Sequence, residues 1–371
     1  MAKRGMSIHI GLNNLCATHY SDTGFRFLPS CINDAKYMAE LVSKYFKEPV
    51  PFYDTVKKQF DKKPNLLLLD ENGNTNNLLQ IMEEIAKGEN KLVEGDILLL
   101  TYSGHGGQIP SREQPAESDG FDETWCLYDR QFIDEEIFEL FTKFEKGVRI
   151  LVISDSCNNG TVIGKKEVDI LDLYKIVLFE KKFNYNNFQS KILDVQGHNF
   201  AKFEEDEWKR NKSILEGLNF DTSDNNLKKI EISKTKSLPG DLLTAIYKET
   251  NHTLEYRKKQ HDVRIRLLNE QSKRKKNDIR ELVESSVILI SACQDWQKTA
   301  PGGNETELSK FTQVFKNVWN DGNFNNYLEL HQKLWNFFDR TAINSSDIQN
   351  PNYYTIGTPN PTFELEKPLT V

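Results

Sequence analysis

Residues 96–107 read DILLLTYSGHGG, and residues 149–160 read RILVISDSCNNG. Each stretch begins with a continuous apolar run, which predicts a buried strand, and ends in a polar tip that contains glycine. His105 stands in the first tip and Cys157 in the second. If the two strands are parallel neighbours, both tips emerge at the same edge of the sheet. The two stretches therefore predict an α/β fold that brings a histidine and a cysteine together.

The two tips carry the residue types of a nucleophile and its base. A free cysteine is most often a small buried hydrophobe, but Cys157 lies in a tight polar turn that packing alone does not require. Such a turn can expose the sulfur and aim backbone N–H groups at a developing oxyanion. His105, between two glycines, can take the thiol proton and later give it to a leaving amine. We interpret the pair as a Cys–His dyad, which indicates a peptidase.

Strand-like and helix-like patterns alternate along the rest of the chain. This alternation, with continuous apolar strands, predicts a mostly parallel sheet covered by helices on both faces. In such sheets the functional sites lie beyond the carboxyl ends of the strands, where both tips stand. The predicted strands are 6–11, 65–69, 96–102, 149–154, 286–291 and 362–365, and the predicted helices are 33–46, 76–87, 134–144, 311–319 and 327–338.

The composition excludes several classes of protein. A chain of 371 residues, 38% of them hydrophobic, is long enough for one large α/β domain with insertions or for two small domains. The formal net charge of −7 gives no support for a nucleic-acid partner, which usually needs a basic face. The five cysteines include no CxxC pair, which argues against a disulfide framework or a structural zinc site and favours a reducing compartment.

The hydropathy pattern gives no support for a membrane partner. No run approaches the roughly 18 apolar residues of a membrane span. The N-terminus reads MAKRGMSIHIGLN and has no long apolar segment of the kind that a secretory signal carries. We therefore expect a cytoplasmic protein.

Several motifs resemble those of the caspase-like cysteine peptidases, and most of all those of the metacaspase and orthocaspase branch. The resemblance covers roughly residues 6–160 and 285–365, and its motifs occur in the family order. It implies a caspase-like three-layer sandwich, with a mostly parallel central sheet of about six strands, helices on both faces and a helical insertion. The motifs are YSGHG at 102–106, DGFDE at 119–123, DSC at 155–157 with Gly160, CINDA at 31–35 and ISAC at 290–293.

The resemblance also implies a division of the chain into three parts. Residues 1–164 correspond to the large-subunit-like half with the histidine and the cysteine, and residues 285–371 to the small-subunit-like half that completes the sheet. Residues 165–284 are polar, in part helical by pattern, and rich in lysine and arginine in places. We interpret this middle part as an insertion or linker, with a separate solvated helical subdomain as the alternative. It is a candidate for self-cleavage or for control by an activating ligand or partner.

Catalytic roles follow from the resemblance residue by residue. It implies Cys157 as the nucleophile and His105 as the general acid and base. The backbone N–H groups of Cys157 and Gly106 would form the oxyanion hole. Bacterial relatives of this branch often serve in stress, cell-death or antiphage pathways, which makes antiviral defence an expectation for this chain.

Three further residues match the pocket that receives the substrate residue before the scissile bond: Asp34, Ser103 and Asp155. Carboxylates in such a pocket suit a cationic side chain. We therefore predict cleavage of proteins or peptides after Arg or Lys. For Asp34 an acid at a helix N-terminus remains the alternative, and for Asp155 a turn residue.

The chain departs from the family pattern in two places. The family usually has Cys-His-Ser-Gly where this chain has CNNG at 157–160, so the shape of the pocket stays open. The chemistry itself requires no cofactor, but many metacaspases are activated by calcium. Asp119, Asp134 and Glu135 could match three of those ligands, whereas Gly164 stands near the place of a further expected acid. Calcium is coordinated by about six or more oxygen atoms, and these residues supply only part of such a set. The acidic residues could therefore form either a calcium site or a solvated acidic loop, and the metal is unknown.

Two rival functions have the same motifs. One is a caspase-like pseudoenzyme that acts as a binding or scaffold module, although such proteins usually lack the histidine or the cysteine. The other is a Cys–His hydrolase of another type, such as a thioesterase. Labelling of Cys157 by a reactive probe that ends in arginine would separate both from a peptidase.

Overall fold

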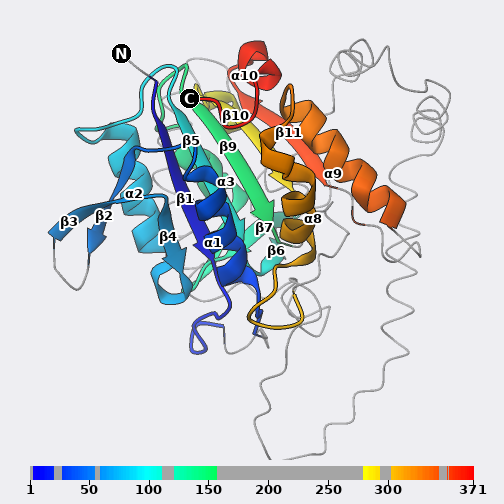
Figure 1. Ribbon diagram of the computed structural model, residues 1–371. Coiled ribbons are helices and arrows are strands. Elements are labelled where there is room, and N and C mark those ends of the chain that lie inside the picture. Colours follow the sequence, from blue (N-terminus) through cyan, green and yellow to red (C-terminus); the bar gives the residue numbers. More distant parts are fainter. Residues whose placement is uncertain are drawn as a thin grey trace, which may run out of the picture. The chain divides into compact units, whose positions relative to one another are not determined.

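A six-stranded sheet forms the centre of the protein (Figure 1). The computed structural model describes residues 3–20, 27–54, 59–110, 121–156, 279–292, 302–341, 349 and 351–371. The strand order is β11-β10-β9-β5-β1-β4, and only β11 runs antiparallel to its neighbour. The predicted mostly parallel sheet of about six strands is confirmed. Its strands are β1 (Gly5–Gly11), β4 (Leu66–Leu69), β5 (Ile97–Ser103), β9 (Arg149–Asp155), β10 (Ser286–Ser291) and β11 (Asn352–Gly357).

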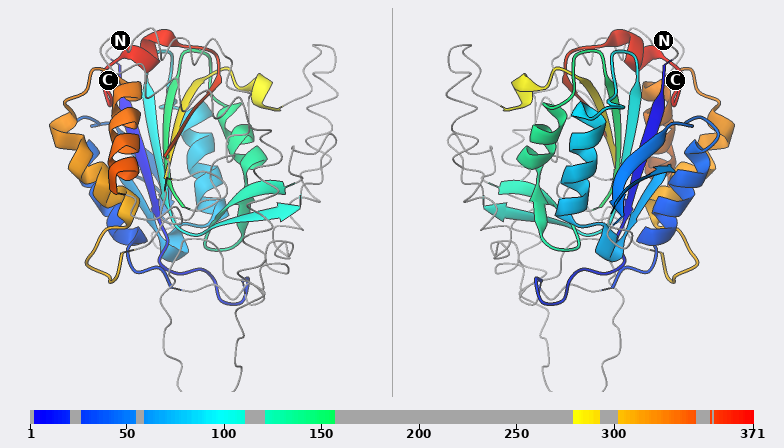
Figure 2. Two further views of the ribbon diagram at one scale, coloured as in Figure 1. Left: turned by 90° about the vertical axis from the view of Figure 1, so that its right-hand side faces the viewer. Right: turned by 90° about the vertical axis from the view of Figure 1, so that its left-hand side faces the viewer.

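Helices cover both faces of this sheet and make the predicted three layers (Figure 2). One face packs against α1 (Cys31–Val42), α8 (Lys310–Trp319) and α9 (Tyr327–Thr341), and the other against α2 (Thr75–Lys87) and α3 (Asp134–Phe141). No helix within the described ranges is long and apolar enough to cross a membrane.

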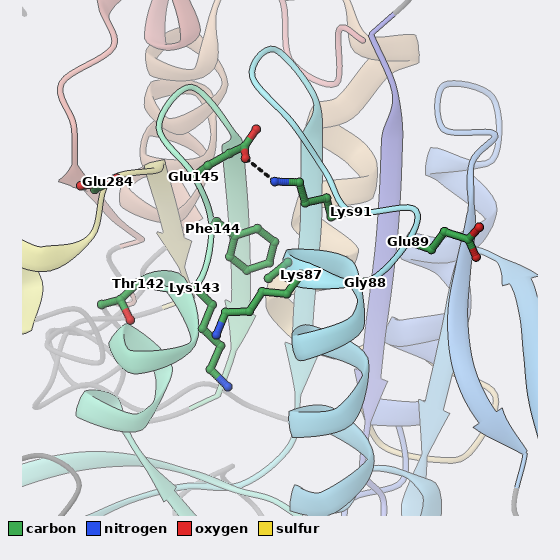
Figure 3. A pocket seen from close by; sticks show the side chains of 10 residues that line it. Lys87, Gly88, Glu89, Lys91, Thr142, Lys143, Phe144, Glu145 and Glu284 are labelled. Atoms are coloured by element: carbon green, nitrogen blue, oxygen red, sulfur yellow. Dashed lines mark hydrogen bonds and ion pairs between the residues drawn. The ribbon is translucent and has the colours of Figure 1, made fainter. Parts of the chain in front are cut away.

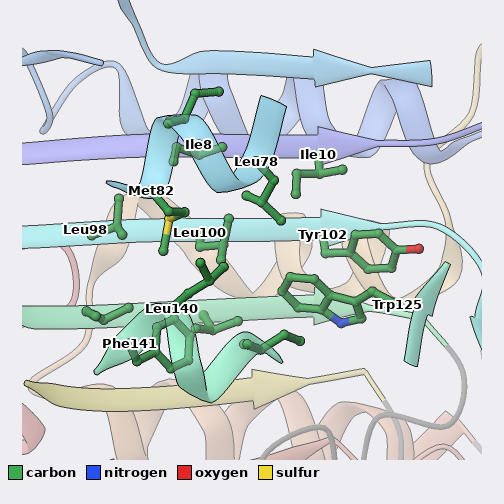
Figure 4. Close-up of a cluster of buried hydrophobic side chains, with 14 of the residues drawn as sticks. Ile8, Ile10, Leu78, Met82, Leu98, Leu100, Tyr102, Trp125, Leu140 and Phe141 are labelled. Atoms are coloured by element: carbon green, nitrogen blue, oxygen red, sulfur yellow. The ribbon is translucent and has the colours of Figure 1, made fainter. Parts of the chain in front are cut away.

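The central strands bury side chains on both faces, which explains their continuous apolar runs. All seven residues of β5 are buried. Ile97 and Leu99 belong to the core beneath α1, α8 and α9, whereas Leu98 and Leu100 belong to the core beneath α2 and α3 (Figure 4). Successive side chains of a strand point to opposite faces, so a strand between two helical layers must be apolar at both sets of positions.

Helix α2 shows how the sequence sets a helix on that face. The Asn74 side chain accepts a hydrogen bond from the backbone N–H of Asn77 at 2.9 Å and so caps the first turn. The helix ends at Lys87, before Gly88. Its apolar stripe faces the sheet and is buried at Leu78, Ile81, Met82 and Ile85.

The prediction for the end of the chain was wrong. Residues 361–365 form a short helix, α10 (Pro361–Leu365), instead of a strand. Asn360 accepts a hydrogen bond from the backbone N–H of Phe363 at 3.0 Å, and Pro361 suits the first helical turn. The strand of this region is β11, ten residues earlier, which pairs antiparallel with β10.

Two smaller sheets and three short 3-10 helices complete the described part. The sequence did not predict the hairpin of β2 and β3. The strands are β2 (Pro49–Asp54), β3 (Gln59–Pro64), β6 (Gly106–Pro110), β7 (Phe121–Cys126) and β8 (Gln131–Ile133). The 3-10 helices are η1 (Asp70–Asn72), η3 (Ile279–Leu282) and η4 (Asn320–Gly322).

The N-terminal and C-terminal halves of the chain meet where β9 pairs with β10 in the central sheet. Strand β10 lies beside β9 in parallel, with Ser291 opposite Ser154, although β10 begins 131 positions after β9 ends (286 − 155). Residues 157–278 lie outside the described residues. The predicted boundaries at 164 and 284 therefore stay predictions.

Candidate active site

The two strands that carry the predicted dyad are direct neighbours. Strands β5 and β9 pair in parallel, and their register places Ser103 opposite Asp155 at the carboxyl ends. His105 comes two residues after Ser103, and Cys157 comes two residues after Asp155. His105 is buried, with 1% of its surface exposed. Cys157 lies outside the described residues, but the last residue before it, Ser156, is buried at the same sheet edge.

A tyrosine fixes the backbone of His105. The Tyr102 hydroxyl donates a hydrogen bond to the His105 carbonyl at 2.6 Å and lies 3.0 Å from the Cys126 carbonyl. The backbone N–H of Cys126 donates to the same His105 carbonyl at 3.0 Å. A Cβ atom at position 104 would lie 2.5 Å from the Tyr102 hydroxyl, so this turn requires Gly104.

The same tyrosine connects the histidine strand with the cysteine strand. The rings of Tyr102 and Trp125 are stacked, with centroids 4.6 Å apart and planes 7° apart (Figure 4). The Trp125 indole N–H donates to the Ser154 hydroxyl at 3.0 Å. Ser154 lies in β9, three residues before Cys157. The contacts of Tyr102 and Trp125 thus join the carboxyl ends of β5 and β9.

The three residues predicted for the substrate pocket lie together. Asp34 belongs to the first turn of α1, and its Oδ2 accepts a hydrogen bond from the Ser103 hydroxyl at 2.7 Å. Asp155, at the end of the neighbouring strand, is buried like the other two, with 3% of its surface exposed. All three line one small cavity whose other walls are mainly apolar: Ala35, Met38, Ile153, Phe311 and Phe315.

Two residues of the C-terminal half, Ser309 and Thr312, also contact these acids. The sequence did not predict a role for either residue. The hydroxyls of Ser309 and Thr312 donate to Asp155 Oδ2, the latter at 2.8 Å. The Ser309 backbone N–H donates to Asp34 Oδ1 at 2.9 Å. A serine directly before the apolar stripe of α8 is a helix-start signal, and it was the one feature of the sequence that pointed to this position.

The segment 302–309 is held on the start of α1. The Asn33 amide donates to the carbonyls of Glu305 at 2.5 Å and Glu307 at 3.1 Å. The backbone N–H of Gly302 donates to the Ser30 hydroxyl at 3.0 Å. Asn33 thus anchors the C-terminal half, while the next residue, Asp34, faces the cavity.

The remaining predicted residues are less informative. Gly106 is the first residue of β6, where it lies opposite Trp125, and Asp119 lies outside the described residues. Asp134 and Glu135 are buried in the first turn of α3. Within the part of the chain that can be described, no three His, Cys, Asp or Glu side chains are grouped so that they could hold a metal ion. The calcium question therefore stays open.

Two other cysteines near the sheet lack the properties of a nucleophile. Cys126 is fully buried, and burial raises the pKa of its thiol far above the usual range. A thiol that stays protonated attacks poorly, because the thiolate is the nucleophile. Cys31 is buried at the start of α1.

A surface hollow lies elsewhere, between the ends of α2 and α3 (Figure 3). It lies near the amino ends of β5 and β9, whereas His105 follows the carboxyl end of β5. Its lysines are paired with glutamates: Lys91 with Glu145 at 2.6 Å and Lys143 with Glu83 at 2.6 Å. The hollow therefore offers no concentrated charge of one sign for a ligand.

Comparison with known proteins agrees with this geometry. Residues 10–166 match the model of the family described as metacaspase, peptidase C14 domain. Metacaspase-4 of Arabidopsis thaliana is 30% identical over 146 residues, which are 38% of this chain and 32% of the relative. Metacaspase-1A of Neurospora crassa is 34% identical over 148 residues, which are 37% of this chain and 29% of the relative. The chain thus spans about a third of the length of these curated relatives.

A solved structure resembles this chain over almost its whole length. The crystal structure of protein GSU0716 from Geobacter sulfurreducens has a TM-score of 0.57 and 26% sequence identity, with 99% of both chains covered. The six-stranded sheet and its two helical layers have the arrangement of a caspase-like α/β fold. Within that fold, residues 10–166 are similar to the peptidase domain of the metacaspases.

Proposed function

We propose that this chain is a cysteine endopeptidase that cleaves proteins or peptides after Arg or Lys. The main support for this proposal is the parallel pairing of β5 with β9. This pairing places the strand end that leads to His105 beside the strand end that leads to Cys157. The similarity of residues 10–166 to the metacaspase peptidase domain supports the same class of chemistry.

In this proposal His105 takes the proton of the Cys157 thiol as the sulfur attacks the carbonyl carbon of the scissile bond. The carbonyl oxygen becomes an oxyanion that accepts hydrogen bonds from the backbone N–H groups of Gly106 and Cys157. The imidazolium then gives its proton to the leaving amine as the C–N bond breaks, which leaves a thioester. A water molecule, deprotonated by His105, hydrolyses the thioester, and the thiol regains its proton.

The buried acids support the preference for a basic residue. Asp34 and Asp155 line one cavity with apolar walls, and 1% and 3% of their surfaces are exposed. A long basic side chain can lay its methylene stem on such walls and place its cation at the carboxylates. A substrate aspartate would instead bring a further negative charge into the same buried space.

Control of the activity is part of the proposal. Self-cleavage within residues 165–284, an activating ligand or partner, and a stress or antiphage role follow from the family resemblance alone. The intact mass of the purified chain, measured after incubation with and without calcium, tests processing and metal dependence together. A chain that is active and unprocessed would rule out a requirement for self-cleavage.

Cleavage of fluorogenic peptides that end in Arg, Lys or Asp tests the proposed specificity. We expect cleavage of the Arg and Lys peptides, and loss of that activity in Cys157→Ala. Cleavage of the Asp peptide alone would contradict the pocket, and full activity of Cys157→Ala would contradict the mechanism. Binding of the Arg peptide without cleavage would favour the pseudoenzyme.

A further inference from the structure

Ser309 contacts both acids of the pocket. Its backbone N–H donates to Asp34 Oδ1 at 2.9 Å, and its hydroxyl donates to Asp155 Oδ2. Ser309 is completely buried, and it comes from the C-terminal half, whereas the acids come from α1 and β9. One residue therefore spans the two carboxylates.

We propose that Ser309, together with Thr312, is a positioning residue that orients Asp34 and Asp155 to receive an arginine side chain. The inference rests on the proposed peptidase function and deepens it, because it names residues that set the specificity of the same pocket. Neither residue belongs to the motifs that indicated the pocket from the sequence.

Neutral hydrogen-bond donors hold the carboxylates of Asp34 and Asp155. Buried carboxylates are costly unless they are hydrogen-bonded. Four donors meet this need: the hydroxyls of Ser103, Ser309 and Thr312 and the Ser309 backbone N–H. All four donors are neutral, so these contacts orient the carboxylate oxygens without adding a positive charge to the pocket.

The segment 302–309, which carries Ser309, is anchored to the start of α1. Asn33 binds two carbonyls of residues 305–307, and Ser30 binds the N–H of Gly302. Ser309 is therefore fixed relative to Asp34, which follows Asn33 in the same helical turn. Such support from a second layer of contacts is what keeps a binding group in its productive orientation.

Arginine and lysine differ in how strictly the carboxylates that bind them must be oriented. The planar guanidinium binds carboxylates through two parallel N–H···O bonds and needs correctly oriented oxygens. The lysine ammonium is a compact point charge with rotatable donors, and it tolerates a turned carboxylate. Loss of the Ser309 or Thr312 hydroxyl should therefore weaken arginine recognition more than lysine recognition.

The test compares Ser309→Ala and Thr312→Val with the unchanged chain on Arg- and Lys-ended peptides. Removal of a hydrogen bond to a charged group changes an equilibrium by roughly 10-fold or more. We expect KM for the Arg peptide to rise about 10-fold in each variant, KM for the Lys peptide to rise less, and kcat to stay within about two-fold. Thr312→Ser, which keeps the hydroxyl, should restore KM.

Two controls separate positioning from a general structural effect. Thr306→Ala removes a hydroxyl of the same segment that bonds Asn304 and is exposed, so its KM values should stay unchanged. The rate at which iodoacetamide, a small uncharged reagent, alkylates Cys157 should be equal in all variants, because the dyad is intact.

Three outcomes would overturn the inference. Unchanged KM values in Ser309→Ala and Thr312→Val would do so while the proposed function stands. An increase in kcat/KM would show that the segment blocks the pocket instead of organising it. No cleavage of either peptide by the unchanged chain would overturn the proposed function, and the inference with it.

Discussion

The Tyr102 hydroxyl donates a hydrogen bond to the carbonyl of His105 at 2.6 Å. Tyr102 is the last apolar residue of the strand that leads to the histidine, and its ring is stacked on Trp125. Tyr102 therefore packs in the hydrophobic core and also fixes the backbone of His105, the proposed general base.

Replacement of Tyr102 by phenylalanine should slow catalysis with little effect on binding. The ring stays in place, but the His105 carbonyl loses one of its two donors, so the imidazole is held less firmly. Small displacements of reacting groups are costly in rate. We expect kcat to fall about 10-fold, KM to stay unchanged, and the free energy of unfolding to fall by about 1 kcal/mol.

Tyr20→Phe is the matched control for Tyr102→Phe. The Tyr20 hydroxyl also donates to a backbone carbonyl, that of Leu127 at 2.8 Å, and it is equally buried. This variant should lose a similar free energy of unfolding and keep its kcat. Equal kcat values for both variants would show that the Tyr102 hydroxyl has only a structural role.

The acids of the pocket should matter for binding of the basic residue. Asp155→Asn keeps the shape of the side chain and removes its charge. Loss of one partner from a buried charge pair typically costs 2 kcal/mol or more, so we expect kcat/KM on the Arg peptide to fall by at least about 30-fold. The alkylation rate of Cys157 by iodoacetamide should not change.

Asp321→Asn is the control for the loss of one negative charge, since 95% of its side-chain surface is exposed. It should leave kcat/KM within about two-fold. A similar fall in both variants would point to long-range electrostatics, and no fall in Asp155→Asn would contradict the pocket.

His9 should make stability depend on pH. It lies in β1, fully buried, with its ring nitrogens 2.9 Å from the hydroxyls of Thr101 and Ser7. Burial lowers the pKa of His9 to about 3, from 6.5 in the unfolded chain. Between these two values the unfolded chain binds one more proton than the folded chain, so stability is retained above pH 6.5 and falls as the pH decreases toward 3.

Urea unfolding at pH 7.5 and at pH 5.0 measures this contribution. One proton corresponds to a slope of at most about 1.4 kcal/mol per pH unit. The variant His9→Gln keeps hydrogen-bonding groups but cannot titrate in this range, so its free energy of unfolding should fall less between the two pH values. An unchanged slope in His9→Gln would assign the pH dependence to other groups.

The buried strands could be predicted well from the sequence, because burial on both faces leaves a continuous apolar run. Strand β10 has the predicted bounds, and β5 and β9 differ from theirs by one residue. The edge strand β11 could not be recognised in this way. Its residues NYYTIG are mostly half-buried, so neither a continuous apolar run nor a clean alternation marks it.

The acids of the candidate site could be named from motifs, but their surroundings could not. Ser309 lies 154 positions from Asp155 and 275 positions from Asp34 in the sequence. No local pattern reports a contact over such a separation; only the pairing of β10 with β9 and the packing of α8 bring the segments together. The stacking of Tyr102 on Trp125 and the hydrogen bond from Trp125 to Ser154 could not be predicted for the same reason.

Covalent labelling tests the central claim most directly. A peptide chloromethyl ketone that ends in arginine should alkylate the full chain once, and peptide mapping by mass spectrometry should locate the adduct on Cys157. The same peptide ending in aspartate should label at least about 30-fold more slowly, by the same electrostatic argument. An adduct on Cys16, Cys31, Cys126 or Cys293, or equal rates for the two peptides, would contradict the proposed dyad or its pocket.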